Sequence, residues 1–402
     1  MVLYKNAEFQ QERCMKTMTS RERIQAAIDH KPVDRVPLDM TISYVAYNKL
    51  CDHMKWDSLR VNNASIWSVA FPAPEFYEKM SIDCIYVGLK PPPGTPLLRF
   101  GIDETYTNEF GQEYVKVVES SGAIAYELTN APAKDFTLED LKNWKLPDPL
   151  DDAIFEGLEE KCKQLYENTD KALVGYFGAS IFSAPSFIRG MEQWFVDMYE
   201  DPDFTLLFMK RFHDYYTKMY SKALDLVGKY ITFVRTDMDD FGSQQGPFIS
   251  PAIFREQVKP YLKSFYDSIK AKFAQVNPLG RLMKHSCGDN SAFIDDYIEI
   301  GVDMLDPLQS TAGKMSREFL ARYKGRIAFR GNIDTQKVLP YGTPTDVKND
   351  VKDAIRHLAS PSGFICGPVH HILGDVPPEN IVAMRDAVLE YGQVKDGKLV
   401  NL

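Results

Sequence analysis

The sequence lacks a long apolar run, a block of basic residues and any pair of cysteines in a CxxC spacing. Without about 20 consecutive apolar residues, no membrane-spanning helix is expected. The net charge is −9, which together with the missing basic block argues against nucleic acid or an anionic membrane as a partner. The six cysteines are scattered over 402 residues, so neither a disulfide framework nor a structural zinc finger is expected. Free thiols fit a reducing compartment.

The N-terminal segment, residues 1–23, has no apolar core of the kind that a signal peptide needs. A cytoplasmic protein is therefore expected. The sequence also has no internal repeat and no low-complexity tract. We predict one domain over residues 1–402, with residues 1–18 as an N-terminal extension, and the sequence leaves a homodimer open.

Short apolar segments alternate with helical patterns along most of the chain. Such segments are typical of parallel strands that are covered on both faces. Regular alternation of strand and helix predicts an α/β fold, here a (β/α)8 TIM barrel. Residues 90–149 break the alternation with polar, strand-like segments, which predicts an inserted β-hairpin or cap. The predicted barrel strands are Arg35–Met40, Ile82–Val87, Ala172–Phe177, Thr232–Asp237, Arg281–His285, Met304–Asp306, Arg326–Arg330 and Gly363–Cys366.

Polar residues follow almost every predicted strand. Active sites of such barrels lie at the carboxyl ends of the strands, so these residues are predicted to meet at one rim. Loop Asp and Asn residues also cap helices, and this alternative holds for Asp240, Asp306 and Asp334. The residues concerned are Asp39, Ser180, Asp239, Asp240, His285, Cys287, Asp306, Gln309, Asn332, Asp334, Cys366, His370 and His371.

The segment Arg281-Leu-Met-Lys-His285-Ser-Cys287-Gly288 carries the strongest chemical signal. Residues two apart on a strand point to the same side, so one side presents an imidazole and a thiolate together. This pair is half of a soft-metal site, and it favours zinc. A buried thiol beside a hydrogen-bonded histidine is the alternative.

A third ligand is available from the predicted last strand. The segment Gly363-Phe-Ile-Cys-Gly-Pro-Val-His-His371 offers Cys366 and His370 at the same rim as His285. Three protein ligands with an open fourth position are typical of catalytic rather than structural zinc. The pattern leaves Cys366 and His370 both open.

Other residues near strand ends are candidates for substrate binding. Tyr44 and Phe177 could line an aromatic pocket, although aromatic residues are mostly core. Arg189 and Arg235 could hold a carboxylate or a phosphate, with an ordinary ion pair as the alternative.

Several motifs in their order along the chain resemble the uroporphyrinogen decarboxylase superfamily. They lie within Thr19–Gly392 and imply a (β/α)8 barrel and an enzyme. The motifs are Asp34-Arg-Val-Pro37, the run from Asp239 to Pro251, His285-Ser-Cys-Gly288, the run from Gly301 to Gln309, Gly331-Asn-Ile-Asp-Thr-Gln336 and Val376-Pro-Pro-Glu-Asn380.

The chain departs from the true decarboxylases at the segment that follows the first strand. The decarboxylases carry Arg-Gln-Ala-Gly-Arg there, which binds substrate carboxylates, whereas this chain has residues 38–44 without arginine. Decarboxylation of a tetrapyrrole is therefore not expected. The chain is closest in site chemistry to the cobalamin-linked methyltransferases, which bind zinc through a His-x-Cys pair and a later Cys. This resemblance implies zinc on His285, Cys287 and Cys366, with His370 as the alternative third ligand.

The resemblance implies transfer of a methyl group from a methoxylated, aromatic substrate to a corrinoid. No Asp-x-His-x-x-Gly motif is present, so a partner protein is expected to carry the corrinoid. Three alternatives remain: transfer from methylcobalamin to a thiol, metal-free decarboxylation of another acid, and a non-catalytic barrel. Within the proposed site, Asp239 is assigned as a base or further ligand and Asp334 as a group that orients His285. Substrate contacts are assigned to Asp39, Tyr44, Phe177 and Asn332.

Overall fold

The computed structural model describes residues 17–61, 68–118, 124–359 and 362–402. Almost all of the predicted N-terminal extension, residues 1–18, lies outside these ranges. Among the described residues, no helix combines the length and the apolar content needed to cross a membrane.

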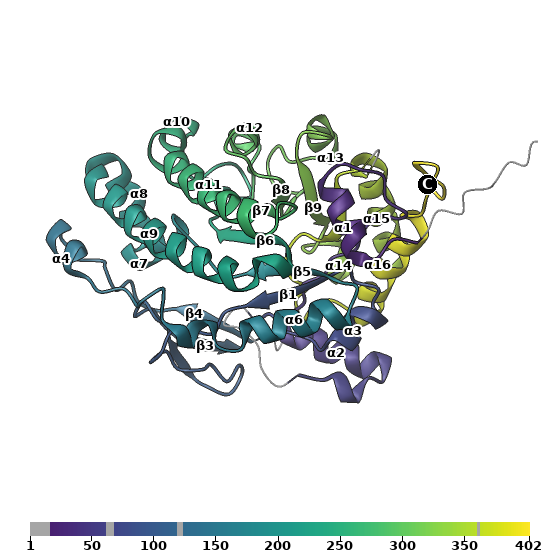
Figure 1. Cartoon of the computed structure of the whole chain (residues 1–402), viewed down its shortest axis with the longest axis horizontal. Coiled ribbons are helices and arrows are strands. Elements are labelled where there is room, and N and C mark those ends of the chain that lie inside the picture. Colours follow the sequence, from purple (N-terminus) through teal and green to yellow (C-terminus); the bar gives the residue numbers. More distant parts are fainter. Residues whose placement is uncertain (1–16, 62–67, 119–123, 360–361) are drawn as a thin grey trace, which may run out of the picture.

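The fold is built on a seven-stranded parallel sheet that curls into a barrel-like shape (Figure 1). The strands are short and almost fully buried, as expected for strands with structure on both sides. Seven of the predicted segments are therefore confirmed as strands of one parallel sheet in an α/β fold. In spatial order they are β1 (Cys84–Gly88), β5 (Ala172–Tyr176), β6 (Ile231–Met238), β7 (Arg281–His285), β8 (Met304–Asp306), β9 (Ala328–Ile333) and β10 (Phe364–Pro368).

The predicted first strand, Arg35–Met40, is not a strand. This segment forms single bridges instead, among them Leu38 with Cys366 of β10. On its other side, Leu38 O accepts a hydrogen bond of 2.8 Å from Asp83 N. Pro37 has no N–H to donate, and Leu38 N donates to the Asp83 carboxylate rather than to a backbone carbonyl. The segment thus runs between the two edge strands without completing a ladder.

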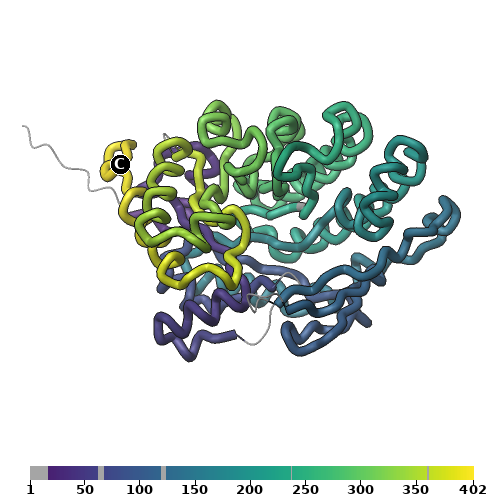
Figure 2. The backbone as a smooth tube through the Cα atoms, turned by 180° about the vertical axis from the view of Figure 1, so that it is seen from behind, coloured from purple at the N-terminus to yellow at the C-terminus, as the bar shows by residue number. Residues whose placement is uncertain are grey.

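Helices lie around the outside of the curled sheet (Figures 1 and 2). Most of them follow a strand and return the chain to the start of the next one. The α-helices are α1 (Ser20–Ile28), α2 (Tyr44–Met54), α3 (Pro74–Lys79), α4 (Leu138–Asn143), α5 (Asp152–Phe155), α6 (Leu158–Asn168), α7 (Ser183–Arg189), α8 (Met191–Glu200), α9 (Pro202–Val227), α10 (Pro251–Ile253), α11 (Lys259–Val276), α12 (Ile294–Glu299), α13 (Arg317–Leu320), α14 (Val338–Tyr341), α15 (Pro344–Leu358) and α16 (Pro378–Tyr391).

Helix α1 closes the amino end of the barrel. It begins with a capping box, in which Thr19 and Glu22 satisfy each other's backbone N–H groups. Ile24, Ala27 and Ile28 pack with inward-facing side chains from every strand of the sheet, two of them from β5. The inward layer consists of Cys84, Ala172, Val174, Phe233, Met283, Met304, Ala328 and Ile365. Because this end is filled with apolar side chains, any site inside the barrel must lie at the carboxyl end.

A separate antiparallel sheet of three strands stands between β1 and β5 in the chain. Its strands are β2 (Thr105–Thr107), β3 (Glu113–Val118) and β4 (Ile124–Leu128). Phe100 links this sheet to the barrel, because its ring lies 5.7 Å from Tyr44 and 5.5 Å from Tyr126. The sheet falls within residues 90–149, and its role as an inserted cap stays a prediction. A short hairpin, β11 (Val394–Lys395) with β12 (Lys398–Leu399), ends the chain.

Candidate metal centre

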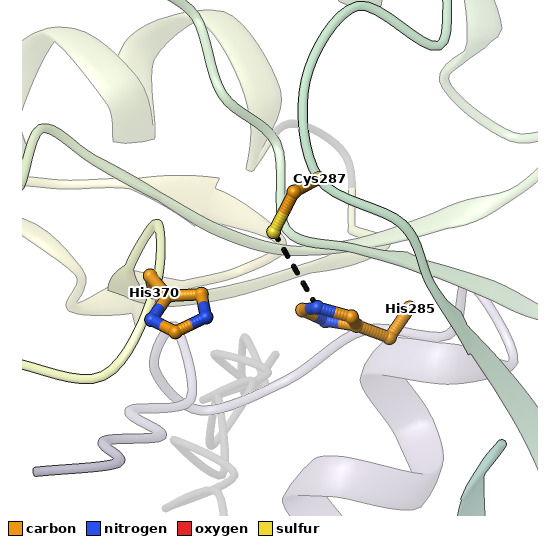
Figure 3. A group of neighbouring side chains, drawn as sticks. All are labelled: His285, Cys287 and His370. Carbon is orange, nitrogen blue, oxygen red and sulfur yellow. Dashed lines mark hydrogen bonds between the residues drawn. The ribbon is translucent and has the colours of Figure 1, made fainter. Parts of the chain in front are cut away.

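Three side chains that can bind a metal converge at the carboxyl end of the sheet. His285 ends β7, Cys287 follows it, and His370 lies in the loop after β10 (Figure 3). One ligand atom from each lies within 4.8 Å of the others. His285 Nε2 is 3.5 Å from Cys287 Sγ. The predicted same-side pair is therefore present, and a third ligand joins it.

The turn after β7 holds Cys287 in place. Gly288 has a φ of +76°, and a Cβ there would lie 2.2 Å from Gly242 O, so only glycine fits. Cys287 N donates a hydrogen bond of 2.6 Å to Asp240 Oδ1. Asp240 is 43% exposed and lies 3.9 Å from His285 Nε2, which places a carboxylate on the solvent side of the cluster.

Cys366 does not join the cluster, which corrects the preference for it as third ligand. Side chains alternate along β10, and Ile365 belongs to the inward layer. Cys366 therefore points outward, where it packs in the core beneath the helices and burial raises the pKa of its thiol. His370 lies beyond the end of β10 and is free of this alternation. The geometry selects His370.

Asp306 orients His285. The two residues are register partners on β8 and β7, and Asp306 Oδ2 lies 2.6 Å from His285 Nδ1. Burial alone would raise the pKa of Asp306, but the Arg330 and Arg235 guanidiniums outweigh it and keep the carboxyl ionised. An ionised acceptor at Nδ1 fixes the proton there and leaves Nε2 as the ligand atom. The expected partner, Asp334, instead accepts a 2.7 Å hydrogen bond from Gln336 N.

The protonation states suit metal binding. Burial lowers the pKa of His285 and of His370, and it lowers the pKa of His371 to about 4. The imidazoles are therefore neutral near pH 7 and can donate a lone pair. Burial and the Asp240 carboxylate raise the pKa of Cys287, so its thiol must lose a proton when a metal binds.

Inside the barrel, a polar layer lies directly above the apolar layer that packs on α1. Each of its members follows an inward apolar residue by two positions, so it points inward as well. The polar layer consists of Tyr86, Tyr176, Arg235, His285, Asp306 and Arg330. We call this polar layer the barrel floor. The metal cluster lies at its edge, because His285 belongs to both.

Asp39 contacts this layer and is closed to solvent. It is fully buried, and its Oδ2 accepts hydrogen bonds from Tyr86 Oη at 2.6 Å and Arg330 Nε at 2.9 Å. Arg330 Nη1 also donates to Asp306 Oδ1 at 2.9 Å. Asp39 therefore holds Arg330, which in turn holds Asp306. Its assignment as a substrate contact is not supported.

Asp239 serves the fold rather than the cluster. It is fully buried and accepts hydrogen bonds from Ser180 Oγ and from the backbone N–H groups of residues 181–183. These groups form the loop before α7 and its first turn. All of these hydrogen bonds anchor that turn. The Asp239 carboxylate is therefore not directed at the metal cluster, where a base or a further ligand would have to lie.

The remaining predicted substrate contacts also lie elsewhere. Phe177 is 4% exposed and packs edge-on against Tyr220 of α9 at 5.5 Å, on the outer side of the sheet. Asn332 is fully buried and its Oδ1 accepts a 2.6 Å hydrogen bond from Arg317 Nε. Tyr44 begins α2 and its ring contacts Phe100. Among these three, only Tyr44 remains partly exposed.

Arg330 was not among the predicted site residues, and Arg235 and Asp306 were predicted without a role beside His285. The signal was present, because each is a charged residue within or at the end of an apolar strand, two positions after an inward apolar residue. A charged side chain that points inward from such a strand needs a partner inside the barrel. The tyrosines of the floor, Tyr86 and Tyr176, give no such signal since tyrosine is common in strands.

Comparisons with known proteins bear on this site. The family model described as uroporphyrinogen decarboxylase (URO-D) matches residues 126–391. A solved structure of a methyltransferase from Methanosarcina mazei is similar over 93% of this chain and 99% of its own, with a TM-score of 0.66 and 18% identity. At that identity the likeness shows the fold. DHODH from Eimeria tenella, solved with ferulenol, has a TM-score of only 0.37 and 13% identity over 79% of this chain and 77% of its own. No curated protein matches.

Proposed function

Because the chain belongs to the uroporphyrinogen decarboxylase (URO-D) family, we propose that it is a zinc-dependent methyltransferase of the cytoplasm. It moves a methyl group from a methoxylated aromatic substrate to the corrinoid of a partner protein. The cluster of His285, Cys287 and His370 is the observation that carries the proposal. The fold shared with the Methanosarcina mazei methyltransferase supports it.

The donor set fits zinc. Two imidazole nitrogens and one thiolate are ligands that zinc prefers, and three protein ligands leave a position for substrate. Asp306 accepts the Nδ1 proton of His285, an arrangement that typically supports a zinc-bound histidine. Zinc bound by these residues would act as a Lewis acid on the ether oxygen.

The charge of the donor set favours an oxygen leaving group. His285 and His370 are neutral, and Cys287 contributes a single negative charge, so the three ligands do not cancel the charge of a divalent ion. A positive centre stabilises an oxygen that gains the bonding electrons as the methyl–oxygen bond breaks. A corrinoid held by the partner protein would supply the nucleophilic cobalt that accepts the methyl group. A metal site with a single thiolate ligand therefore favours transfer of the methyl group from an ether to the corrinoid over methylation of a thiol.

Elemental analysis of the purified protein tests the proposal. We expect about one zinc per chain in the wild type, and its loss in Cys287→Ala. Cys366→Ala is the matched control, since it removes a buried thiol that points away from the cluster and should keep the zinc. The zinc-loaded wild type should then demethylate a methoxyarene when cob(I)alamin is supplied. Wild-type protein without zinc, or methylation of a free thiol without any demethylation, would reject the proposed function.

A metal-free decarboxylase is the second candidate. Arg235, whose side chain is 15% exposed beside the cluster, supports it because such enzymes hold a carboxylate with an arginine. Activity toward an acid that is unaffected by chelators and by Cys287→Ala would favour this candidate.

A further inference from the structure

Arg235 is the charged residue of the barrel floor whose bonding is incomplete on the side of the metal cluster. Arg330 is 2% exposed and is held by Asp39 and Asp306; its Nη2 also lacks a partner among the described residues, but it is buried away from solvent. The Arg235 side chain is 15% exposed, and its Nε reaches Asp306 Oδ2 only at 3.2 Å. In the part of the chain that the structure describes, Arg235 Nη1 has no hydrogen-bond partner.

The second nitrogen of Arg235 faces a group that cannot satisfy it. Arg235 Nη2 lies 2.6 Å from His285 Nδ1, and Asp306 Oδ2 lies 2.6 Å from the same nitrogen. A ring nitrogen carries either a proton or a lone pair, so it serves one neighbour only. The carboxylate is a pure acceptor and requires the proton on Nδ1. The N–H of Arg235 Nη2 then meets another N–H, so neither terminal nitrogen of this guanidinium has a protein acceptor among the described residues.

The unsatisfied edge of Arg235 lies next to the metal cluster. Its guanidinium carbon stands 5.3 Å from the ring centroid of Tyr176, which supports one face of the planar group. Arg235 contacts His285 directly, and His285 is a member of the cluster. An anion held on this edge would therefore stand beside the position open to substrate.

We propose that Arg235 binds a carboxylate of the substrate, so that the substrate is a methoxylated aromatic acid rather than a neutral ether. A guanidinium offers two parallel N–H groups that match the two oxygens of a carboxylate. Binding satisfies the donors that His285 Nδ1 cannot satisfy. This inference rests on the proposed function for the methoxy group, whereas the recognition of the carboxylate depends on Arg235 alone.

Calorimetric binding of two matched ligands tests the inference. 4-Methoxybenzoate and 4-methoxybenzamide have nearly the same shape and differ in charge. We expect the wild type to bind the acid about tenfold more tightly than the amide. Arg235→Gln should remove this preference and leave amide binding unchanged, and Arg235→Lys should retain part of it. Arg322→Gln, on the exposed surface, is the control and should behave as wild type.

The outcomes separate this inference from the proposed function. Zinc content and demethylation report on the proposed function, whereas the preference for acid over amide is measured with and without zinc. Equal affinity of the wild type for both ligands, or no binding of the acid, overturns the inference. An equal loss for both ligands in Arg235→Gln also overturns it, provided that circular dichroism shows a folded variant. If Arg235→Gln does not fold, the wild-type preference and the Arg235→Lys variant decide.

Discussion

His285 and Asp306 are register partners on the neighbouring parallel strands β7 and β8, and 2.6 Å separates His285 Nδ1 from Asp306 Oδ2. The carboxylate is fully buried and is held ionised by two arginines. One residue of the sheet ladder therefore sets both the tautomer and the direction of a metal ligand. This relationship leads to the first prediction.

Asp306→Asn should weaken zinc binding roughly 10–100-fold, because a neutral amide orients the imidazole less firmly. It should also lower the free energy of unfolding by about 3–5 kcal/mol, since Arg235 and Arg330 lose a buried counter-charge. Zinc titration and denaturant unfolding measure the two effects. Asp334→Asn is the control, since the hydrogen bonds that its carboxylate accepts within the described part of the chain come from backbone N–H groups of its own loop. Unchanged zinc affinity in Asp306→Asn would contradict the assigned role.

The third ligand can be identified by three single substitutions. His370→Ala should weaken zinc binding by more than the roughly 10–100-fold expected for an outer partner, because a direct ligand is lost. His371→Ala and Cys366→Ala should retain zinc, since neither side chain belongs to the cluster among the described residues. Cobalt(II) absorption spectra of the three variants would report the donor set directly. Retention of metal by His370→Ala together with its loss in Cys366→Ala would reverse the assignment.

Zinc binding should release about one proton per ion near pH 7. Burial lowers the pKa of His285 and His370, so both bind zinc without losing a proton, whereas burial raises the pKa of Cys287, which must lose one. Zinc affinity should then rise about tenfold per pH unit while the histidines are neutral and the thiol is protonated. Below the lowered histidine pKa values the dependence should become steeper. Calorimetry in two buffers of different ionisation enthalpy measures the proton count, and a count of zero or of two would contradict these states.

Gly288→Ala should destabilise the turn that presents Cys287. The backbone φ of +76° costs a side chain about 1–3 kcal/mol, and the added Cβ would lie 2.2 Å from Gly242 O. Thermal unfolding and zinc content should both fall. Gly246→Ala, in the loop that contains Gly242, is the matched control because nothing lies within 4 Å of the position that its methyl group would take and its φ is not positive. Equal stability of the two variants would show that the turn tolerates a side chain.

Local patterns were sufficient for much of the fold. The apolar segments predicted the positions of seven strands. His285 and Cys287 were paired on the expectation that both lie on one strand; Cys287 in fact lies in the turn after β7, which still brings its Sγ to 3.5 Å from His285 Nε2. The prediction of a strand at Arg35–Met40 was wrong because Pro37 and the Asp83 side chain interrupt its hydrogen-bond ladder. Asp83 lies far from this segment in the sequence, so the local pattern could not reveal its effect.

The sequence by itself determined the α/β alternation and the pairing of an imidazole with a thiol. Tertiary structure alone decided which residues face inward and which residues meet. Cys366 and Ile365 are neighbours in sequence, and the register of β10 against β9 sends the thiol out to the helices. Asp306 meets His285, and Arg235 approaches both, because the strands stack in a fixed register. Register depends on the packing of the whole barrel, and for that reason spacing along one strand could not reveal it.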